Sequence, residues 1–498
     1  MNDQTETPVS RRKAFLLTLP FGLIFVFSVS LITVCAWYAL SFDLEFKELL
    51  YTLASPLKGT GQSTVFQILL SCLPLVCICT GGFIWIAVRL WCSEKRFYRW
   101  RRIGAGFCAF LLIGSLIFSV ISLRVPAYLR ALSEQTTIYE EYYVNPDDVL
   151  ITADGKTKNL IYIYLESMET TYASVAEGGA QHANFMPQLT QLAKENVSFS
   201  DKADLLGGFH TPLGTGWTVS ALLATTSGIP FSFPLGENGH NKMSQHEEFA
   251  TGLTTLGDIL EERGYAQFFL CGSDGDFGGR KTYFEQHGNY EVFDYYKTKD
   301  AGYIPENYKK WWGYEDEVLY EVAKSELTKM AEGDQPFNFT MLTVDTHHVD
   351  GYICDICDDR WGNRLANVVN CADSQIAEFI TWCQNQDFYE DTVIIITGDH
   401  PRMDTTLVSE VDYYDRTIYN CFMNTAVTPE GATTERVFTS FDMFPTTLAA
   451  MGFSIEGERL GFGVNMFSGE ATLAEQIGYD YLEAEISKFS SFYIREFS

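Results

Sequence analysis

Three long apolar stretches fill the first 123 residues and constrain the fold more than any other feature of this sequence. The stretch 15–40 is nearly free of charge, 64–91 has one charge near its end, and 103–123 has none. Each reaches the roughly 20 residues that a helix needs to cross a bilayer. The first is too long for a signal peptide and contains Trp37 and Tyr38, residues typical of a membrane interface. We therefore predict a transmembrane region, 1–123, with three helices.

Basic residues flank these stretches unequally, which predicts their orientation. They precede the first stretch and crowd the segment between the second and third, at Arg11, Arg12, Lys13, Lys95, Arg96, Arg99, Arg101 and Arg102. Between the first and second stretches, Lys47 and Lys58 are offset by three acidic residues. Because cytoplasmic loops carry the excess of Lys and Arg, the N-terminus faces the cytoplasm. We expect a multi-pass protein of the bacterial cytoplasmic (inner) membrane, with everything after residue 123 on the periplasmic or extracellular side.

The rest of the chain is strongly acidic. Residues 1–130 hold 13 basic and 6 acidic residues, which leaves 22 basic and 58 acidic residues in 131–498, a formal charge of −36. Nucleic-acid binding requires a positive surface, so this domain is not expected to bind nucleic acid. The acidity also argues against broad adsorption on anionic lipid.

The twelve cysteines divide evenly between the two halves. Six lie in or beside the apolar stretches, where we expect them to pack as small apolar residues. The other six are Cys271, Cys354, Cys357, Cys371, Cys383 and Cys421. An even number in an oxidising compartment suggests disulfides. Cys354 and Cys357 have the C-x-x-C spacing of redox and zinc sites, but a single C-x-x-C is a weak signal.

From residue 159 onward, predicted strands and helices alternate. This pattern indicates an α/β domain with a mostly parallel sheet flanked by helices. The run NLIYIYL at 159–165 is apolar throughout, as in a strand buried on both faces. We predict further strands at 266–270, 337–344 and 392–397, and helices at 188–196, 252–264, 312–332, 363–385 and 441–451. Residues 124–158 are predicted to be a juxtamembrane linker and 159–498 the folded outer domain.

Polar residues follow three of the predicted strands. Glu166 follows the first, His347 and His348 the third, and Asp399 and His400 the fourth. Ligands of open parallel sheets bind at the carboxyl ends of strands, so these side chains are expected to converge. Carboxylates and imidazole are ligands of Zn²⁺ and Mn²⁺. The alternative is that Glu166 caps a helix and Asp399-His400 forms a turn.

A glycine-rich segment, 207–230, leads into a small-residue helix that is predicted to start near Trp217 or Thr218. A hydroxyl at a helix N-terminus lies in a positive field among free N–H donors. This setting favours an attacking alkoxide, and a nearby metal would lower the pKa of the Thr218 hydroxyl. Thr218 could equally be a simple N-cap, and nearby hydroxyls could compete for the role, namely those of Thr211, Thr215 and Ser220. The sequence contains no G-x-S-x-G elbow and no P-loop.

Two further groups suit a phosphate. His347 and His348 could bind a phosphate or act as a general acid, although either could be a structural histidine. Arg280 offers a guanidinium for bidentate phosphate contact, although it could be an ordinary surface arginine.

Five motifs occur in a fixed order: LES at 165–167, GTGWT at 214–218, F-x-x-R at 277–280, THH at 346–348 and GDH at 398–400. This order resembles the lipoteichoic acid synthase and phosphoglycerol transferase family, within the alkaline phosphatase/sulfatase superfamily. The stretch from GTGWT to SGIP is most similar to the phosphoglycerol transferases that modify osmoregulated periplasmic glucans. The resemblance covers about residues 159–455 and implies an alkaline phosphatase-like fold.

The resemblance also implies roles for the matching residues. A divalent metal, Mn²⁺ before Zn²⁺ or Mg²⁺, would be held by Glu166, Thr218, Asp399 and His400. Thr218 would be the catalytic nucleophile. The phosphoglycerol head group would be contacted by Arg280, His348, His347 and Trp217. His348 is preferred to His347 because its spacing to Tyr352 resembles the family's His-x-x-x-aromatic pattern.

The implied reaction transfers phosphoglycerol from phosphatidylglycerol to an envelope glycan through a covalent phosphothreonine. Three alternatives remain open: a phosphoethanolamine transferase acting on an envelope lipid or glycan, a phosphodiesterase, and a non-enzymatic envelope sensor with a degenerate catalytic domain. Two features depart from the synthases: Gly278 stands where they carry a substrate-contacting Trp, and three membrane stretches replace their usual five. The sulfatase motif Cys-x-Pro-x-Arg is absent, so a sulfatase mechanism is not expected.

Overall fold

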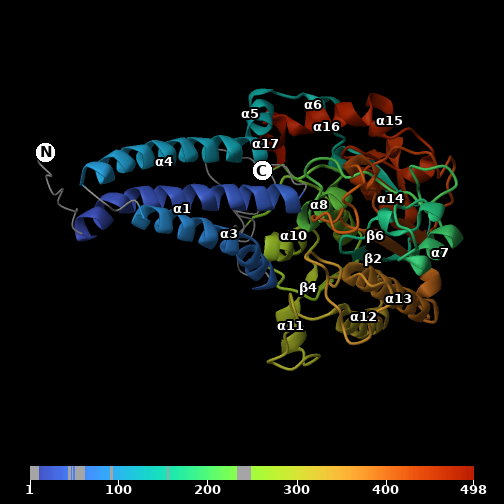
Figure 1. Cartoon of the computed structure of the whole chain (residues 1–498). Coiled ribbons are helices and arrows are strands. Elements are labelled where there is room, and N and C mark those ends of the chain that lie inside the picture. The colour runs from blue at the N-terminus through green and yellow to red at the C-terminus, as the bar shows by residue number, and fades with distance from the viewer. Residues whose placement is uncertain are drawn as a thin grey trace, which may run out of the picture. The chain divides into compact units, whose positions relative to one another are not determined.

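The computed structural model describes residues 11–42, 46, 49–50, 62–89, 94–153, 155, 157–232 and 248–497. The chain divides into two compact units and passes from the first to the second between Arg130 and Ala131. Figure 1 shows the helices of the first unit in blue and the mixed helices and strands of the second in green to red.

The first unit consists of long apolar helices: α1 (Arg11–Ser41), α3 (Gln62–Arg89) and α4 (Glu94–Ser122). Three spans within them are long and apolar enough to cross a membrane, namely Phe15–Ser41, Ile68–Ala87 and Phe97–Ser122. Large apolar side chains point outward, as at Leu40 (80% exposed) and Phe110 (76% exposed). Such exposure suits a hydrocarbon environment and not water. The three predicted stretches are therefore helical.

The basic segment before the third stretch differs from the prediction. Lys95 to Arg102 were expected in a loop, but they form the first turns of α4, which begins at Glu94. Lys95 and Arg96 thus precede the apolar span, which starts at Phe97, and the three arginines that follow lie within its first turns. The segment with Lys47 and Lys58 lies outside the described residues. A short amphipathic helix, α5 (Val125–Ser133), follows α4.

The second unit is built on a six-stranded sheet. Its strand order is β4-β3-β5-β2-β6-β7, and all neighbours are parallel except β6 and β7. The strands are β2 (Asn159–Leu165), β3 (Ala266–Cys271), β4 (Glu291–Phe293), β5 (Phe337–Leu342), β6 (Thr392–Gly398) and β7 (Asn420–Met423). This arrangement confirms the predicted α/β class with a mostly parallel sheet.

Both faces of the sheet are covered, because alternate residues of each strand point to opposite sides. The even-numbered residues of β2, from Leu160 to Tyr164, enter a core with α8 (Thr218–Ser227), α9 (Leu256–Glu262), α10 (Arg280–Gln286) and α14 (Met443–Ala450). The odd-numbered residues, from Ile161 to Leu165, enter a second core with α7 (Pro187–Glu195), α11 (Tyr295–Asp300), α12 (Asp316–Ala331) and α13 (Arg364–Gln384). The sheet is thus buried on both sides, as its apolar strands predict.

Several predicted helices are shorter in the structure, and local caps explain where they begin. The helix expected at 252–264 starts at Leu256, because Thr255 and Asp258 form a reciprocal capping box. The helix expected at 312–332 starts at Asp316, after backbone hydrogen bonds between Lys310 and Gly313. The helix expected at 441–451 starts at Met443, after a 3-10 turn capped by Thr439.

The segment 124–158, predicted as a linker, is largely part of the second unit. It contains α6 (Ile138–Tyr142) and β1 (Ile151–Ala153), which pairs with β8 (Phe453–Ile455). Ile138 and Tyr139 are buried in the core, and these isolated apolar residues were hidden among polar neighbours in the sequence. The C-terminal region adds β9 (Arg459–Leu460), β10 (Gly463–Val464), α15 (Leu473–Ile477), α16 (Tyr479–Ser487) and α17 (Ser491–Phe497).

The six cysteines of the outer domain are all free thiols in the structure. The expected disulfides are therefore absent among these six residues. Five of the six are buried, and Cys357 is half-buried.

Candidate active site

The register of the sheet brings two predicted ligands to the same edge. Leu165, the last residue of β2, lies opposite Gly398, the last residue of β6. Glu166 and Asp399 follow directly. The chain turns sharply at Ser167, whose φ is 53°, and its backbone N–H donates to Asp399 Oδ1 at 2.7 Å. The end of one strand is thereby tied to the end of its neighbour.

Glu166, Asp399 and His400 form one buried cluster. Their potential ligand atoms all lie within 4.8 Å of one another. His400 Nε2 is 3.5 Å from Glu166 Oε1 and 3.4 Å from Asp399 Oδ2. All three side chains are almost completely buried. Parallel strand topology, and not proximity in sequence, assembles them.

A fourth residue, Thr218, joins this cluster from helix α8. It is the first residue of α8, and Trp217 before it is the N-cap, whose backbone N–H donates to Ser220 Oγ at 3.1 Å. Thr218 Oγ1 lies 3.2 Å from Glu166 Oε2 and 3.3 Å from His400 Nε2. Thr218 is half-buried, whereas the three other members are buried. The hydroxyl thus sits at the helix N-terminus, on the accessible side of the cluster.

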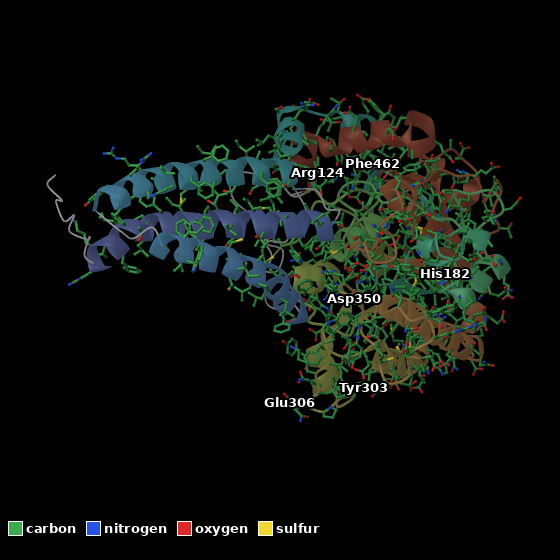
Figure 2. The ribbon with its side chains drawn as sticks, viewed as in Figure 1. Arg124, His182, Tyr303, Glu306, Asp350 and Phe462 are labelled. Carbon is green, nitrogen blue, oxygen red and sulfur yellow. The ribbon has the colours of Figure 1, made fainter. Side chains whose placement is uncertain are left out.

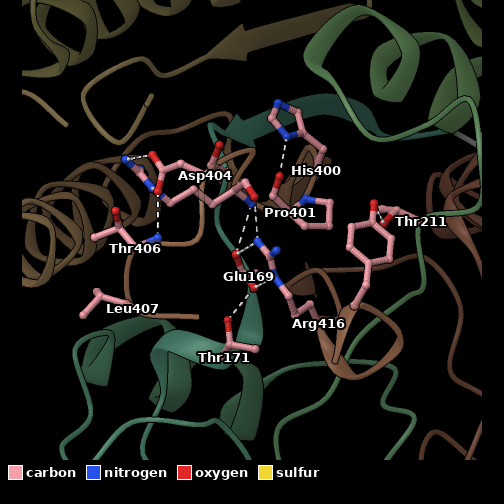
Figure 3. Close-up of polar contacts among 12 residues, drawn as sticks. Glu169, Thr171, Thr211, His400, Pro401, Asp404, Thr406, Leu407 and Arg416 are labelled. Carbon is pink, nitrogen blue, oxygen red and sulfur yellow. Dashed lines mark hydrogen bonds and ion pairs between the residues drawn. The ribbon is translucent and has the colours of Figure 1, made fainter. Parts of the chain in front are cut away.

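The tautomer of His400 follows from its other ring nitrogen. Nδ1 lies 2.8 Å from the carbonyl oxygen of Pro401 (Figure 3). A carbonyl can only accept, so Nδ1 carries a proton, and Nε2 is the ring nitrogen that faces the two carboxylates. This backbone contact is the usual support of a metal-binding imidazole.

The negative charges of the two carboxylates in the cluster are not balanced by a Lys or Arg within it. Burial and the neighbouring Glu166 raise the pKa of Asp399 to about 7. Burial alone would lower the pKa of His400, but the Asp399 and Glu166 carboxylates raise it. Two carboxylates without a permanent cation are held in a buried space, which is unfavourable unless a positive charge joins them.

A divalent cation fits this donor set. Among the described residues, Asp399 Oδ2 is buried and has no hydrogen-bond partner. It faces an imidazole nitrogen and a second carboxylate, which together with a threonine hydroxyl suit Zn²⁺, Mn²⁺ or Mg²⁺. The assignment of Glu166, Thr218, Asp399 and His400 as ligands remains a prediction, and the geometry supports it.

The His347-His348 pair lies close to this cluster. The two rings stack with centroids 4.3 Å apart. Burial lowers the pKa of His347, and the Glu166 carboxylate offsets only part of that effect. Burial and His347 hold the pKa of His348 well below its ordinary value. Trp312 packs on His347 with centroids 4.6 Å apart and on Phe277 at 5.5 Å. Trp312 thus puts an indole ring beside the histidines, although Gly278 stands where the synthases carry a Trp.

Arg280 and Trp217 are more embedded than the sequence indicates. The Arg280 guanidinium donates to Ser273 Oγ at 2.9 Å, to the Asp274 carbonyl at 2.8 Å and to the Phe277 carbonyl at 3.1 Å. Arg280 is 5% exposed, so it is not an ordinary surface arginine. Trp217 is largely buried and packs edge-on against Phe231, with centroids 5.7 Å apart. No described contact joins Arg280 to the Glu166 cluster.

A second buried polar group supports the site and was missed from the sequence. Glu169 accepts two hydrogen bonds from the Arg416 guanidinium, at 2.9 and 2.7 Å, and one from the Arg402 backbone at 3.0 Å (Figure 3). Arg402 pairs with Asp404 at 2.7 Å and donates to the Thr346 carbonyl at 2.7 Å. We call Glu169, Arg402, Asp404 and Arg416 the charge-paired cluster. Its sequence signal was the position of Glu169 and Arg402, within three residues of Glu166 and His400.

The chain is similar in sequence to proteins that have been named for an activity. Phosphoglycerol transferase I from Xanthomonas campestris pv. campestris is 28% identical over 433 residues, covering 85% of this chain and 58% of that protein. Phosphoglycerol transferase I from Escherichia coli is 28% identical over 375 residues, covering 74% of this chain and 46% of that protein. The chain thus spans about half the length of these curated relatives.

Among solved structures, the lipoteichoic acid synthase LtaP from Listeria monocytogenes aligns with 64% of this chain and 79% of its own, at 19% identity and a TM-score of 0.49. The Sulfatase family profile matches residues 158–453, more than half of the chain and all five sequence motifs. The predicted superfamily is confirmed, and the chain belongs to the Sulfatase family.

Proposed function

We propose that the protein is a membrane-anchored phosphotransferase that moves phosphoglycerol from phosphatidylglycerol to an envelope glycan, such as a periplasmic glucan, through a covalent phosphothreonine. The observation that carries the proposal is the position of Thr218. Its hydroxyl stands at the N-terminus of α8, 3.2 Å from Glu166 Oε2 and 3.3 Å from His400 Nε2. The similarity to proteins named phosphoglycerol transferase I supports the choice of head group.

In the first half of the reaction, Thr218 Oγ1 attacks the phosphorus of the donor lipid. Its hydroxyl points toward Glu166 Oε2, and this carboxylate is placed to take the proton. The bond between phosphorus and the diacylglycerol oxygen breaks, and diacylglycerol leaves with a proton. A divalent cation held by Glu166, Asp399, His400 and Thr218, Mn²⁺ before Zn²⁺ or Mg²⁺, would lower the hydroxyl pKa and offset negative charge on the phosphate.

In the second half, a sugar hydroxyl of the acceptor attacks the phosphothreonine. The bond between phosphorus and Thr218 Oγ1 breaks, and the proton lost by the sugar hydroxyl is taken up by Thr218 Oγ1, which restores the threonine hydroxyl. Splitting one displacement into two is the usual benefit of covalent catalysis. The backbone N–H groups at the start of α8 face this position and favour negative charge there.

The remaining predicted contacts surround this step. His348, His347 and Arg280 are proposed to bind the phosphoglycerol head group, with Trp217 flanking the nucleophile. Both histidines have lowered pKa values from burial, so each is a neutral hydrogen-bonding group near neutral pH. The positive charge that grips the phosphate therefore comes from Arg280.

The proposed location follows from the first unit. Three helices long and apolar enough to cross a membrane precede the Sulfatase domain. Basic residues at the start of α1 and at the start of α4 would face the cytoplasm, and the domain would then lie on the outer side. A phospholipid donor has its phosphate at the bilayer surface, so anchoring the enzyme there brings the two together.

The test is the intact mass of the full-length protein in detergent after incubation with phosphatidylglycerol and Mn²⁺. We expect an adduct of ~154 Da, a glycerophosphoryl group, mapped to Thr218 by fragmentation. Adding a glucan acceptor should remove it. An adduct from phosphatidylethanolamine alone would reassign the head group to phosphoethanolamine. Loss of the adduct to water as fast as to the glucan would indicate a phosphodiesterase. No adduct from either lipid, with metal bound, would refute the proposal.

A further inference from the structure

Three cysteines meet within and beside the loop that carries His347 and His348. Cys354 and Cys357 lie in the loop between β5 and α13, the same loop that contains Asp350 (Figure 2). Cys371 lies on α13. Cys354 Sγ is 3.2 Å from Cys357 Sγ and 3.6 Å from Cys371 Sγ, and all three sulfurs fall within 4.8 Å of one another. We call these residues the thiol cluster.

Local hydrogen bonds place the sulfurs. The Cys357 backbone N–H donates to the Cys354 carbonyl at 3.2 Å, which closes the C-x-x-C turn. On α13, the Asn367 side chain accepts from the backbone of Arg360 and Trp361 at 3.0 and 2.8 Å. Cys371 follows Asn367 by four residues and therefore lies on the same helix face. The face that anchors the end of the loop also presents the third sulfur.

The arrangement suits a metal better than a disulfide. A disulfide joins two sulfurs at about 2.05 Å and would leave the third thiol unused. Thiolates bound tetrahedrally to zinc at about 2.3 Å stand about 3.8 Å apart, close to the 3.6 Å between Cys354 and Cys371. The sequence suggested disulfides, but it did not show that Cys371 joins the C-x-x-C pair.

Neighbouring groups also favour thiolates beside a cation. The Gln375 side chain is 6% exposed, and its Nε2 lies 3.4 Å from Cys371 Sγ and 3.9 Å from Cys354 Sγ. Amide donors directed at sulfur are typical support for metal-bound thiolates. Among the described residues, Gln375 Oε1 is buried and has no hydrogen-bond partner.

We propose that Cys354, Cys357 and Cys371 bind a soft divalent cation, Zn²⁺, at a structural site separate from the Glu166 cluster. The three thiols lose three protons on binding, and a fourth ligand completes the tetrahedron. The bound ion ties the loop that carries His347 and His348 to α13. It adds to a hydrogen bond from Arg364 to the Gly351 carbonyl at 3.1 Å.

The first experiment measures zinc per chain in the full-length protein in detergent, using an Asp399→Asn background to remove the metal proposed for the active site. We expect about one zinc in this background and none in the added Cys371→Ser variant. Cys383→Ser is the matched control, because Cys383 is a buried free cysteine on the same helix. Its zinc content should equal that of the background. Equal zinc with and without Cys371 would overturn the proposal.

The second experiment uses the unmutated protein, so it does not depend on a variant folding. Titration with p-mercuribenzoate should release zinc, detected with a metallochromic dye, as the cluster thiols react. In a separate sample that has not met the mercurial, alkylation after denaturation without reductant should modify all three cysteines. A cross-linked pair that alkylates only after reduction would show a disulfide and refute the zinc site. Neither readout depends on catalytic activity, so the proposed function can fail independently.

Discussion

The Glu166 cluster and the charge-paired cluster are two buried polar groups that lie near each other in sequence. They differ in whether their carboxylates have positively charged partners. The Glu166 cluster holds two carboxylates and an imidazole, without Lys or Arg. The charge-paired cluster holds two carboxylates and two guanidinium groups, joined at 2.7 Å in each ion pair. Both are almost completely buried. Burial alone therefore does not distinguish a reactive site from a supporting one.

The pKa shifts record the difference. Burial would raise the pKa of Glu169, but Arg416 lowers it below its ordinary value. In contrast, burial and Glu166 raise the pKa of Asp399 to about 7. The first carboxylate is stabilised by its surroundings, and the second is destabilised until a cation arrives. The charge-paired cluster is balanced in the folded chain, and the Glu166 cluster would be balanced by the proposed cation.

The largest expected effect comes from removing the proposed nucleophile of the Glu166 cluster. Thr218→Ala should lower transfer to the glucan by about 10⁴-fold or more, because no other hydroxyl contacts both Glu166 and His400 among the described residues. Thr218→Ser keeps the hydroxyl and should retain measurable transfer. Rates with labelled phosphatidylglycerol test this. Near-normal turnover in a folded alanine variant would remove Thr218 from the nucleophile role.

The comparison itself is tested by neutralising one carboxylate in each cluster, in the presence of a chelator. Glu169→Gln should lower the free energy of unfolding by about 3–5 kcal/mol, because it leaves the Arg416 charge buried without its partner. Asp399→Asn should leave stability unchanged or raise it. Asp399 Oδ1 accepts from the Ser167 and His400 backbones at 2.7 and 2.8 Å, and an amide oxygen can accept both.

Thermal unfolding of the full-length protein in detergent ranks the stabilities of the wild type and the two variants. With metal added, the wild-type protein should gain stability and Asp399→Asn should gain much less, since a ligand is lost. A chelated Asp399→Asn variant as unstable as Glu169→Gln would show that both clusters serve structure alone.

Sequence patterns predicted the Glu166 cluster better than the charge-paired cluster. Glu166, Asp399 and His400 follow apolar strands directly, and the register of parallel strands then fixes their meeting. Arg416 carried no such signal, because it does not directly follow a strand but precedes β7 (Asn420–Met423). Its pairing with Glu169 depends on how a long loop folds back, which local pattern does not encode.

The contrast between local patterns and long-range pairing also explains which elements were predicted correctly. The strands at 159–165 and 392–397 were predicted closely, because a continuous apolar run depends only on local sequence. The segment 124–158 was taken for a linker, because β1 gains its partner from β8, about 300 residues later. Trp312 beside His347 was also missed, since it precedes α12 and reaches the site only through tertiary packing.

Acid should weaken the charge-paired cluster in a defined pH window. The pKa of Glu169 is lowered in the folded state, so its stabilising effect is fully present above the unfolded value of about 4.5 and is lost as pH falls below it. The difference in melting temperature between wild type and Glu169→Gln should therefore shrink as pH falls from about 5 toward 3. Glu332→Gln, at an exposed position, is the control and should show little difference at any pH. A constant Glu169 difference would contradict the ion-pair account.

The smallest effect is expected at Arg280, which extends the comparison to a third arrangement. Arg402 and Arg416 are each paired with a carboxylate. Among the described residues, Arg280 has no carboxylate partner, and its guanidinium donates to one hydroxyl and two backbone carbonyls. Its charge therefore remains available for a phosphate. Arg280→Lys keeps that charge but loses the planar fork, so KM for the donor lipid should rise about tenfold with little change in melting temperature. If stability fell and KM did not change, Arg280 would be a structural arginine, and the phosphate would need another cation.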